Sequence, residues 1–219
     1  MLAIGCGSSG TPYNPVIDPA NFVAGVTNPY YPLVPGTVYN YSVQKQGVAQ
    51  DVTITVTSDT KVILGVTCIV VHDLVTEGGQ VAEDTWDWYA QDKDGNVWYF
   101  GEDTKKYVNG QVDTEGSWEA GVGGAKPGMI MLGNPQVGDT YRQEYLAGSA
   151  EDQAEILGLN ESITVAAGTY QNCVKTKDWT VLDPGVFENK YFCPDVGQVL
   201  ADMVQGGSER QELVSITAP

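Results

Sequence analysis

The sequence has few basic side chains and only one histidine. Eleven Lys and Arg residues stand against 28 Asp and Glu residues in a chain of 219, which gives a formal net charge of -17 at pH 7. A field of this sign repels phosphate backbones, so the composition argues against nucleic acid as a partner. Within segment 73–119, only Lys93, Lys105 and Lys106 oppose a run of carboxylates. A bound cation or simple solubility explains that run equally well.

Long apolar stretches and the motifs of common enzymes are also missing. No stretch reaches the roughly 18 uncharged apolar residues that a membrane helix requires. There is no Gly-x-Ser-x-Gly elbow, HExxH pair, glycine-rich phosphate loop or CxxC pair. The histidine, His72, shares a predicted strand with Cys68, but four residues of strand separate them by roughly 13 Å, too far for a catalytic dyad. We therefore expect a protein that is not an enzyme.

Alternation with a period of two runs through most of the chain. In segment 51–57, Val52, Ile54 and Val56 face one way and threonines face the other, which predicts a half-exposed strand paired with 37–46. The glycine-rich segment 121–133 is expected to be a mobile loop, and only 149–157 could form a turn or two of helix. Further strands are expected at 61–75, 81–91, 97–100, 140–146, 154–165, 170–180, 187–192, 198–204 and 210–217. The chain is thus predicted to be all-β and antiparallel, with little helix.

Prolines divide the chain into two parts. They recur between Thr11 and Pro35 among few charges, which is typical of an extended linker. We expect residues 1–35 to be a tether that docks onto the domain near 30–33. With 42% hydrophobic residues, the remaining segment 36–219 can bury a core and is predicted to form a single antiparallel β domain.

The first cysteine lies in a segment that resembles a bacterial lipobox. In Leu2-Ala3-Ile4-Gly5-Cys6, small residues precede a cysteine, and Gly7 to Gly10 follow as a flexible tether would. A charged segment and an apolar stretch should precede such a site, so Met1 is expected to be a truncated or misassigned start. The motif predicts lipidation at Cys6, export, and anchoring to a membrane in the periplasm or on the cell surface. A chance cysteine in a disordered tail is the alternative.

Three cysteines remain once Cys6 is set aside, so one of them has no partner. Cys173 and Cys193 flank a predicted hairpin that turns at Asp183-Pro184-Gly185, which places their strands side by side. Because a disulfide requires Cα atoms within about 7 Å, this pair is preferred. Cys68 would then be a buried free thiol. A bridge from Cys68 to Cys173 is the alternative and needs strand neighbours that the sequence does not reveal.

The segment around Asp92, Asp94 and Asn96 has two interpretations. These residues match the first part of a calcium loop, but the sixth position is Val97, where the sharp turn of that loop requires glycine. A hairpin turn with Gly95 in the left-handed conformation explains the same residues and is preferred. Calcium is kept as a possible cofactor, with Asp92, Asp94 and Asn96 as its candidate ligands.

This turn brings four large aromatic residues onto one face of a hairpin. If Asp92 pairs with Asn96, then Trp98 faces a small alanine and Trp88 faces Phe100. The shared face comprises Trp86, Trp88, Trp98 and Phe100. Such a face is either the anchor of the core, which is the preferred interpretation, or the wall of an apolar ligand-binding pocket.

Three segments, 31–39, 167–175 and 191–199, resemble a loose family of uncharacterised exported bacterial lipoproteins. The resemblance spans most of the chain and implies a curved antiparallel sheet, a half-barrel or barrel like those of periplasmic lipoprotein carriers and receptors. It assigns no catalytic residue. By analogy it implies an apolar concave face suited to a lipid or other hydrophobic ligand. We therefore expect a non-enzymatic, lipid-anchored envelope protein that binds an apolar small molecule or a protein partner. The alternatives are a structural or surface interaction protein with a filled core, and a calcium-dependent module.

Overall fold

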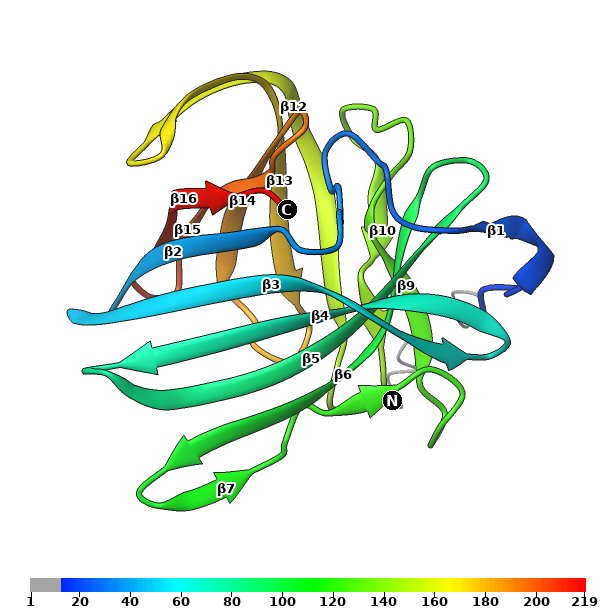
Figure 1. Ribbon diagram of the computed structural model, residues 1–219, viewed down its shortest axis with the longest axis horizontal. Coiled ribbons are helices and arrows are strands. Elements are labelled where there is room, and N and C mark those ends of the chain that lie inside the picture. The colour runs from blue at the N-terminus through cyan, green and yellow to red at the C-terminus, as the bar shows by residue number, and fades with distance from the viewer. Residues whose placement is uncertain (1–12) are drawn as a thin grey trace, which may run out of the picture.

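The structure is a computed structural model that describes residues 13–219, and strands dominate it (Figure 1). One short 3-10 helix, Pro19–Asn21, precedes the strands. No helix within the described range is long and apolar enough to cross a membrane. The strands are β1 (Phe22–Val23), β2 (Val38–Lys45), β3 (Val48–Ile63), β4 (Val66–Glu77), β5 (Gln80–Asp92), β6 (Val97–Val108), β7 (Gln111–Asp113), β8 (Trp118–Glu119), β9 (Lys126–Met131), β10 (Thr140–Arg142), β11 (Glu144–Tyr145), β12 (Asp152–Val165), β13 (Gly168–Thr180), β14 (Phe187–Cys193), β15 (Gly197–Gln205) and β16 (Glu209–Thr217).

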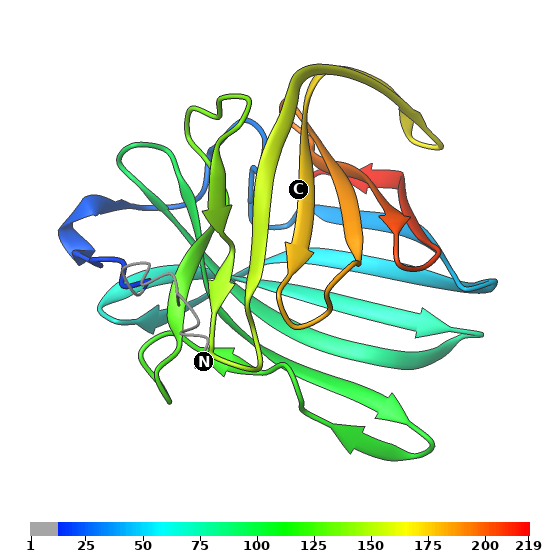
Figure 2. The same ribbon diagram turned by 180° about the vertical axis from the view of Figure 1, so that it is seen from behind.

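These strands form one antiparallel sheet that curves almost into a closed barrel, as the sequence predicts (Figures 1 and 2). The order of strands is β10-β12-β13-β14-β15-β16-β2-β3-β4-β5-β6-β9-β11. The two ends of this order, β10 and β11, are consecutive in the chain, because β10 pairs with β12 and β11 pairs with β9. Segment 140–145 therefore brings the two edges of the sheet together, which limits the exposed edge that an open sheet would present.

The predicted strand 61–75 is divided by a tight turn. Leu64 and Gly65 both have positive φ, 50° and 80°, and they connect β3 to β4. A two-residue hairpin turn of this kind requires a left-handed backbone at both central positions. The prediction of one continuous strand was wrong because the β-branched residues on both sides of the turn hide it in the alternation pattern.

The glycine-rich segment 121–133 is not a loop throughout, and 149–157 is not helical. Lys126–Met131 forms β9, which pairs with β6, and Met131 is fully buried. The glycine at 128 permits this, because a Cβ there would lie 2.4 Å from the carbonyl carbon of Gln143. Segment 152–157 belongs to β12. Pairing with neighbouring strands outweighs the weak local preferences of both segments.

The segment before β2 lies against the sheet. Phe22 and Val23 pair with the end of β5, and Val26 forms an isolated bridge with Leu33. Val26 and Leu33 are buried in the core. Tyr31 packs between Tyr89 on β5 and Phe192 on β14, with ring centroids 5.4 and 6.2 Å away. This segment therefore fills one end of the curved sheet.

Candidate functional site

The interior of the curved sheet contains a cavity of about 330 Å³. Its lining comes from both halves of the sheet, with Asp73 on β4, Asp87 and Tyr89 on β5, and Lys190 and Phe192 on β14. A volume of this size is within the range of small-molecule binding sites. The cavity is thus a candidate ligand site that strands distant in the sequence build together.

The cavity continues into a wider outer region of about 510 Å³ at the hairpin end of the sheet. Both regions are lined by Asp73, Glu83, Glu209 and Gln211. The outer region is also lined by apolar side chains of β2, β3, β4 and β6, namely Val43, Val52, Val75, Tyr107 and Val108. A ligand that enters from this end would cross a partly apolar mouth before it reaches the interior.

One wall of the cavity is acidic and has no ion pairs. Asp73, Glu83, Asp87 and Glu102 project from three neighbouring strands, β4, β5 and β6. Asp87 and Glu102 are direct cross-strand partners, a like-charge arrangement that costs stability when both are ionised. The Tyr99 hydroxyl donates to Oδ1 of Asp87 at 2.6 Å. Within residues 13–219, none of these four carboxylates forms a salt bridge with a basic side chain.

The opposite wall contains lysine side chains that pair with its carboxylates. Nζ of Lys190 lies 3.2 Å from the carboxylate of Asp178 and 3.4 Å from that of Glu188. Burial lowers the pKa of Lys190, but these carboxylates raise it by a larger amount. The net pKa is therefore above its usual value, and the ammonium stays charged. Glu209 pairs with Lys45 at 2.9 Å. Lysine side chains of the protein therefore contact the carboxylates on this side, and the ammonium of Lys190 is shared by two of them.

Burial changes the proton affinity of the acidic wall. Burial, together with the nearby carboxylates Glu83 and Glu102, raises the pKa of Asp73 to about 7. Burial and the charge of Asp73 raise the pKa of Asp87 to about 8, although the hydrogen bond from Tyr99 opposes the shift. Burial and Asp87 raise the pKa of Glu102 to about 8. A cation near these acids would lower their pKa values, because it stabilises the ionised carboxylates.

The four aromatic residues that the sequence places on one hairpin face, Trp86, Trp88, Trp98 and Phe100, do not line this cavity. Side chains alternate along β5, so Trp86 and Trp88 project from the face opposite to Asp87 and Tyr89. Trp86 stacks on His72 with ring centroids 4.1 Å apart, and the Lys61 ammonium lies 3.3 Å from the centroid of Trp88. Trp88 and Phe100 are buried, at 7% and 0% exposure.

The pairing expected between Trp88 and Phe100 is replaced by a bulge. Ala90 pairs with Trp98 as expected, but Trp88 pairs with Gly101, and Phe100 is the extra residue. Gly101 has φ of 131°, and a Cβ there would lie 2.2 Å from the carbonyl oxygen of Trp118 on β8. The close approach of β8 therefore requires glycine and sets the position of the bulge.

The segment around Asp92 forms a hairpin turn. The Asp92 carboxylate accepts hydrogen bonds from the backbone N–H groups of Asp94 and Asn96, the Asn96 side chain and the Trp98 indole, at 2.8 to 3.0 Å. Gly95 is left-handed, with φ of 86°. Asn96 also accepts from the backbone of Gly133. Hydrogen bonds within the protein therefore account for the placement of Asp92 and Asn96, the first and last of the three candidate calcium ligands.

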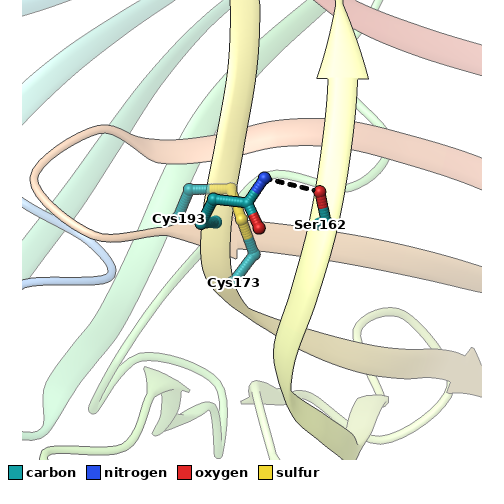
Figure 3. The surroundings of a disulfide bond; sticks show 4 residues. Ser162, Cys173 and Cys193 are labelled. Carbon is teal, nitrogen blue, oxygen red and sulfur yellow. Dashed lines mark hydrogen bonds between the residues drawn. A yellow bond between two sulfur atoms is a disulfide. The ribbon is translucent and has the colours of Figure 1, made fainter.

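Cys173 and Cys193 form the disulfide that the sequence predicts (Figure 3). It links β13 to β14 beside Ser162 of β12, whose hydroxyl accepts a hydrogen bond from the side chain of Gln171 at 2.7 Å. Cys68 is a free, buried cysteine, and burial raises the pKa of its thiol to about 12. Cys68 therefore stays protonated and is a poor nucleophile. Cys6, the predicted lipidation site, lies outside the described residues.

Removal of the disulfide is expected to lower stability. It closes a loop with a sequence separation of 20, for which loop entropy predicts a contribution of about 3 kcal/mol. The double variant Cys173→Ala/Cys193→Ala should lose about that much unfolding free energy in urea titrations, whereas Cys68→Ala should keep the bridge. Non-reducing peptide mapping that finds Cys68 linked to Cys173 would contradict this assignment.

The acidic wall is a site that the sequence pattern does not reveal. Segment 73–119 is acidic, but alternation along a single strand does not indicate which face becomes the interior. The available signal was the set Glu83, Asp87 and Tyr89, whose even spacings of four and two residues place them on one face of the strand. Carboxylates on the face opposite to Trp86 and Trp88 look solvent-exposed until the sheet curves around them.

The fold and the interior cavity together define the class of this protein, a nearly closed, barrel-shaped antiparallel β-sheet whose cavity has one acidic wall. Two solved structures share the fold. One is a Bacteroides fragilis protein described as exported, with a YmcC-like fold, at a TM-score of 0.53 and 12% identity. The other is a Parabacteroides distasonis protein described as a lipoprotein, at a TM-score of 0.51 and 13% identity. Each match covers 86% of this chain and 98% of the other. No protein-family model matches the sequence, and no curated protein matches it significantly.

Proposed function

We propose that this chain is an exported, lipid-anchored, non-enzymatic protein that binds a small molecule inside its curved sheet. The observation that carries the proposal is the interior cavity of about 330 Å³, which opens into the outer region at the hairpin end. A purely structural barrel is expected to fill its interior with packed side chains. Here the interior is instead open and lined by residues of both walls.

The proposed location draws on the lipobox-like segment and on the fold. The segment that ends at Cys6 has the pattern of an acylation site, and the two structural neighbours are described as an exported protein and a lipoprotein. A non-enzymatic role is supported by the chemistry of Cys68, whose buried thiol donates a hydrogen bond to the Val66 carbonyl. That thiol stays protonated and faces away from the cavity, on the face that carries Trp88.

Native mass spectrometry tests the binding function. The full-length protein, purified from its own host in a mild detergent, should retain a non-covalent small molecule and lose it when the collision energy is raised. The mass of the released molecule identifies its class. Protein that is fully empty after gentle purification, and that also fails to bind added small molecules, would favour the structural alternative.

Lipidation is tested by changing Cys6. The wild-type protein should fractionate with membranes, and Cys6→Ser should release most of it into the soluble fraction, because the acyl chains supply the membrane affinity. Cys68→Ser is the matched control and should leave fractionation unchanged. Equal membrane association of Cys6→Ser and wild type would refute the anchor.

A further inference from the structure

We infer that the interior cavity binds an organic ammonium ion, whose cationic group lies against the carboxylates of β4–β6 and whose apolar part lies against the aromatic side chains. The inference rests on the proposed binding function and adds the chemical class of the ligand. It depends on a difference between the two walls of the cavity. Glu188 and Glu209 have lysine partners, whereas Asp73, Asp87 and Glu102 have none among residues 13–219.

Asp73 on the acidic wall has a buried carboxylate oxygen, Oδ1, without a hydrogen-bond donor in the described part of the chain. Buried polar atoms are normally paired, and an unpaired one calls for an explanation such as a ligand or ion. Because Asp73 lines the cavity, a cation that enters it would offset the cost of burying this carboxylate.

The arrangement suits an organic cation better than a metal ion. A calcium ion requires six to eight oxygens that converge at about 2.3–2.6 Å. Within residues 13–219, no group of three or more acidic, histidine or cysteine side chains is placed to hold a metal. The carboxylates are instead distributed over three strands. An ammonium group with several N–H donors can bridge separate carboxylates without such convergence.

The rest of the cavity supplies an apolar and aromatic surface. The lining residues Phe192, Tyr31 and Tyr89 form a continuous series of ring contacts, with centroids 6.2 and 5.4 Å apart. Tyr99 stacks on Tyr89 behind this surface, at 4.8 Å. Ile54 and Val71 extend this surface on β3 and β4. Aromatic faces beside carboxylates attract cations and also pack against alkyl groups. A ligand with an ammonium head and an apolar body therefore matches both surfaces.

Three probes with the same alkyl chain separate charge from apolar binding. Octylammonium, octanol and octanoate are titrated calorimetrically at pH 8.5 into the full chain carrying Cys6→Ser, which requires no detergent. We expect octylammonium to bind at least tenfold tighter than the other two. Asp73→Asn and Glu102→Gln should each weaken octylammonium at least tenfold and leave octanol within about twofold. The control Asp59→Asn, an exposed carboxylate on β3, should change neither.

The outcomes separate this inference from the proposed function. Octanol or octanoate binding as tightly as octylammonium would overturn the ammonium site and leave the binding function intact. Displacement of octylammonium by micromolar calcium would overturn it in favour of a metal site. Failure of all three probes, together with empty protein in native mass spectra, would refute both proposals.

Discussion

The substitution Phe100→Ala is expected to lower the free energy of unfolding by about 3 to 5 kcal/mol, the range found when a large aromatic is removed from a core. Phe100 has 0% exposure, and its ring packs edge-on against Phe22 at a centroid distance of 5.6 Å. It occupies the bulge next to Gly101, where β8 approaches, so the backbone has little freedom to collapse into the space. The loss of unfolding free energy should therefore include most of the contribution from the cavity that the missing ring leaves.

The neighbouring Trp98 provides the matched comparison. It lies on the same face and also contacts Phe22, but it is only half-buried. Trp98→Ala removes partly exposed apolar surface and the indole hydrogen bond to Asp92, so we expect a loss of about 1 to 2 kcal/mol. Urea titrations of both variants test the difference. Equal losses of unfolding free energy would show that Trp98 is as important to the core as Phe100.

The stability of the protein is expected to fall as the pH rises from 5.5 to 8.5. The pKa of Asp87 is about 8 in the folded protein and near 4 in the unfolded chain. Between these values the folded state holds a proton that the unfolded state has lost, so unfolding becomes easier as the pH increases. One such group contributes about 1.4 kcal/mol per pH unit, or about 3 kcal/mol over the part of this interval below its folded pKa.

Several charged groups act on this titration. The pKa of Glu102 and that of Glu144 are each raised to about 8 and that of Asp73 to about 7, all primarily by burial, so these acids contribute with the same sign. Lys106 opposes the shift at Glu102. The ionisable groups that act on Asp87 are Asp73 on β4, Glu83 on β5, Tyr99 on β6 and Glu144 on β11, and Asp87 in turn acts on Glu102 of β6. The ionisable groups of the facing wall are Glu188 and Lys190 on β14 and Glu209 on β16.

A neutral side chain at position 87 tests the assignment. Asp87→Asn keeps an oxygen that can accept the hydrogen bond from Tyr99 and removes the buried charge. It should be more stable than wild type at pH 8.5, by about 1 to 3 kcal/mol, and its stability should depend less on pH. Asp59→Asn removes the same formal charge from the surface and controls for the net charge of -17. Wild-type stability that is flat or rises over this interval would contradict the buried acidic wall.

The sequence alone determined the fold class and most of the strands. Period-two alternation with turn residues between the strands is a local signal, so it identified β2, β5 and most of β12 to β16 without knowledge of their neighbours. The disulfide could also be predicted from the sequence, because Cys173 and Cys193 flank one hairpin and the two strands of a hairpin are adjacent. The turn at Asp92 was equally local, since its hydrogen bonds close within a few residues.

The tertiary structure decided which face of each strand is inside. Alternation separates Trp88 from Asp87, but either face of an isolated hairpin could become the interior. The sheet curves so that the carboxylates of β4 to β6 lie inside, where Tyr31 also lies. The hairpin of β5 and β6 is contacted by two short strands, because β1 pairs with β5 and β8 pairs with β6. The cavity joins residues of β4 (Val66–Glu77) and β5 (Gln80–Asp92) to residues of β14 (Phe187–Cys193), which are far apart along the chain. Such contacts depend on closure of the whole sheet, and no local pattern encodes them.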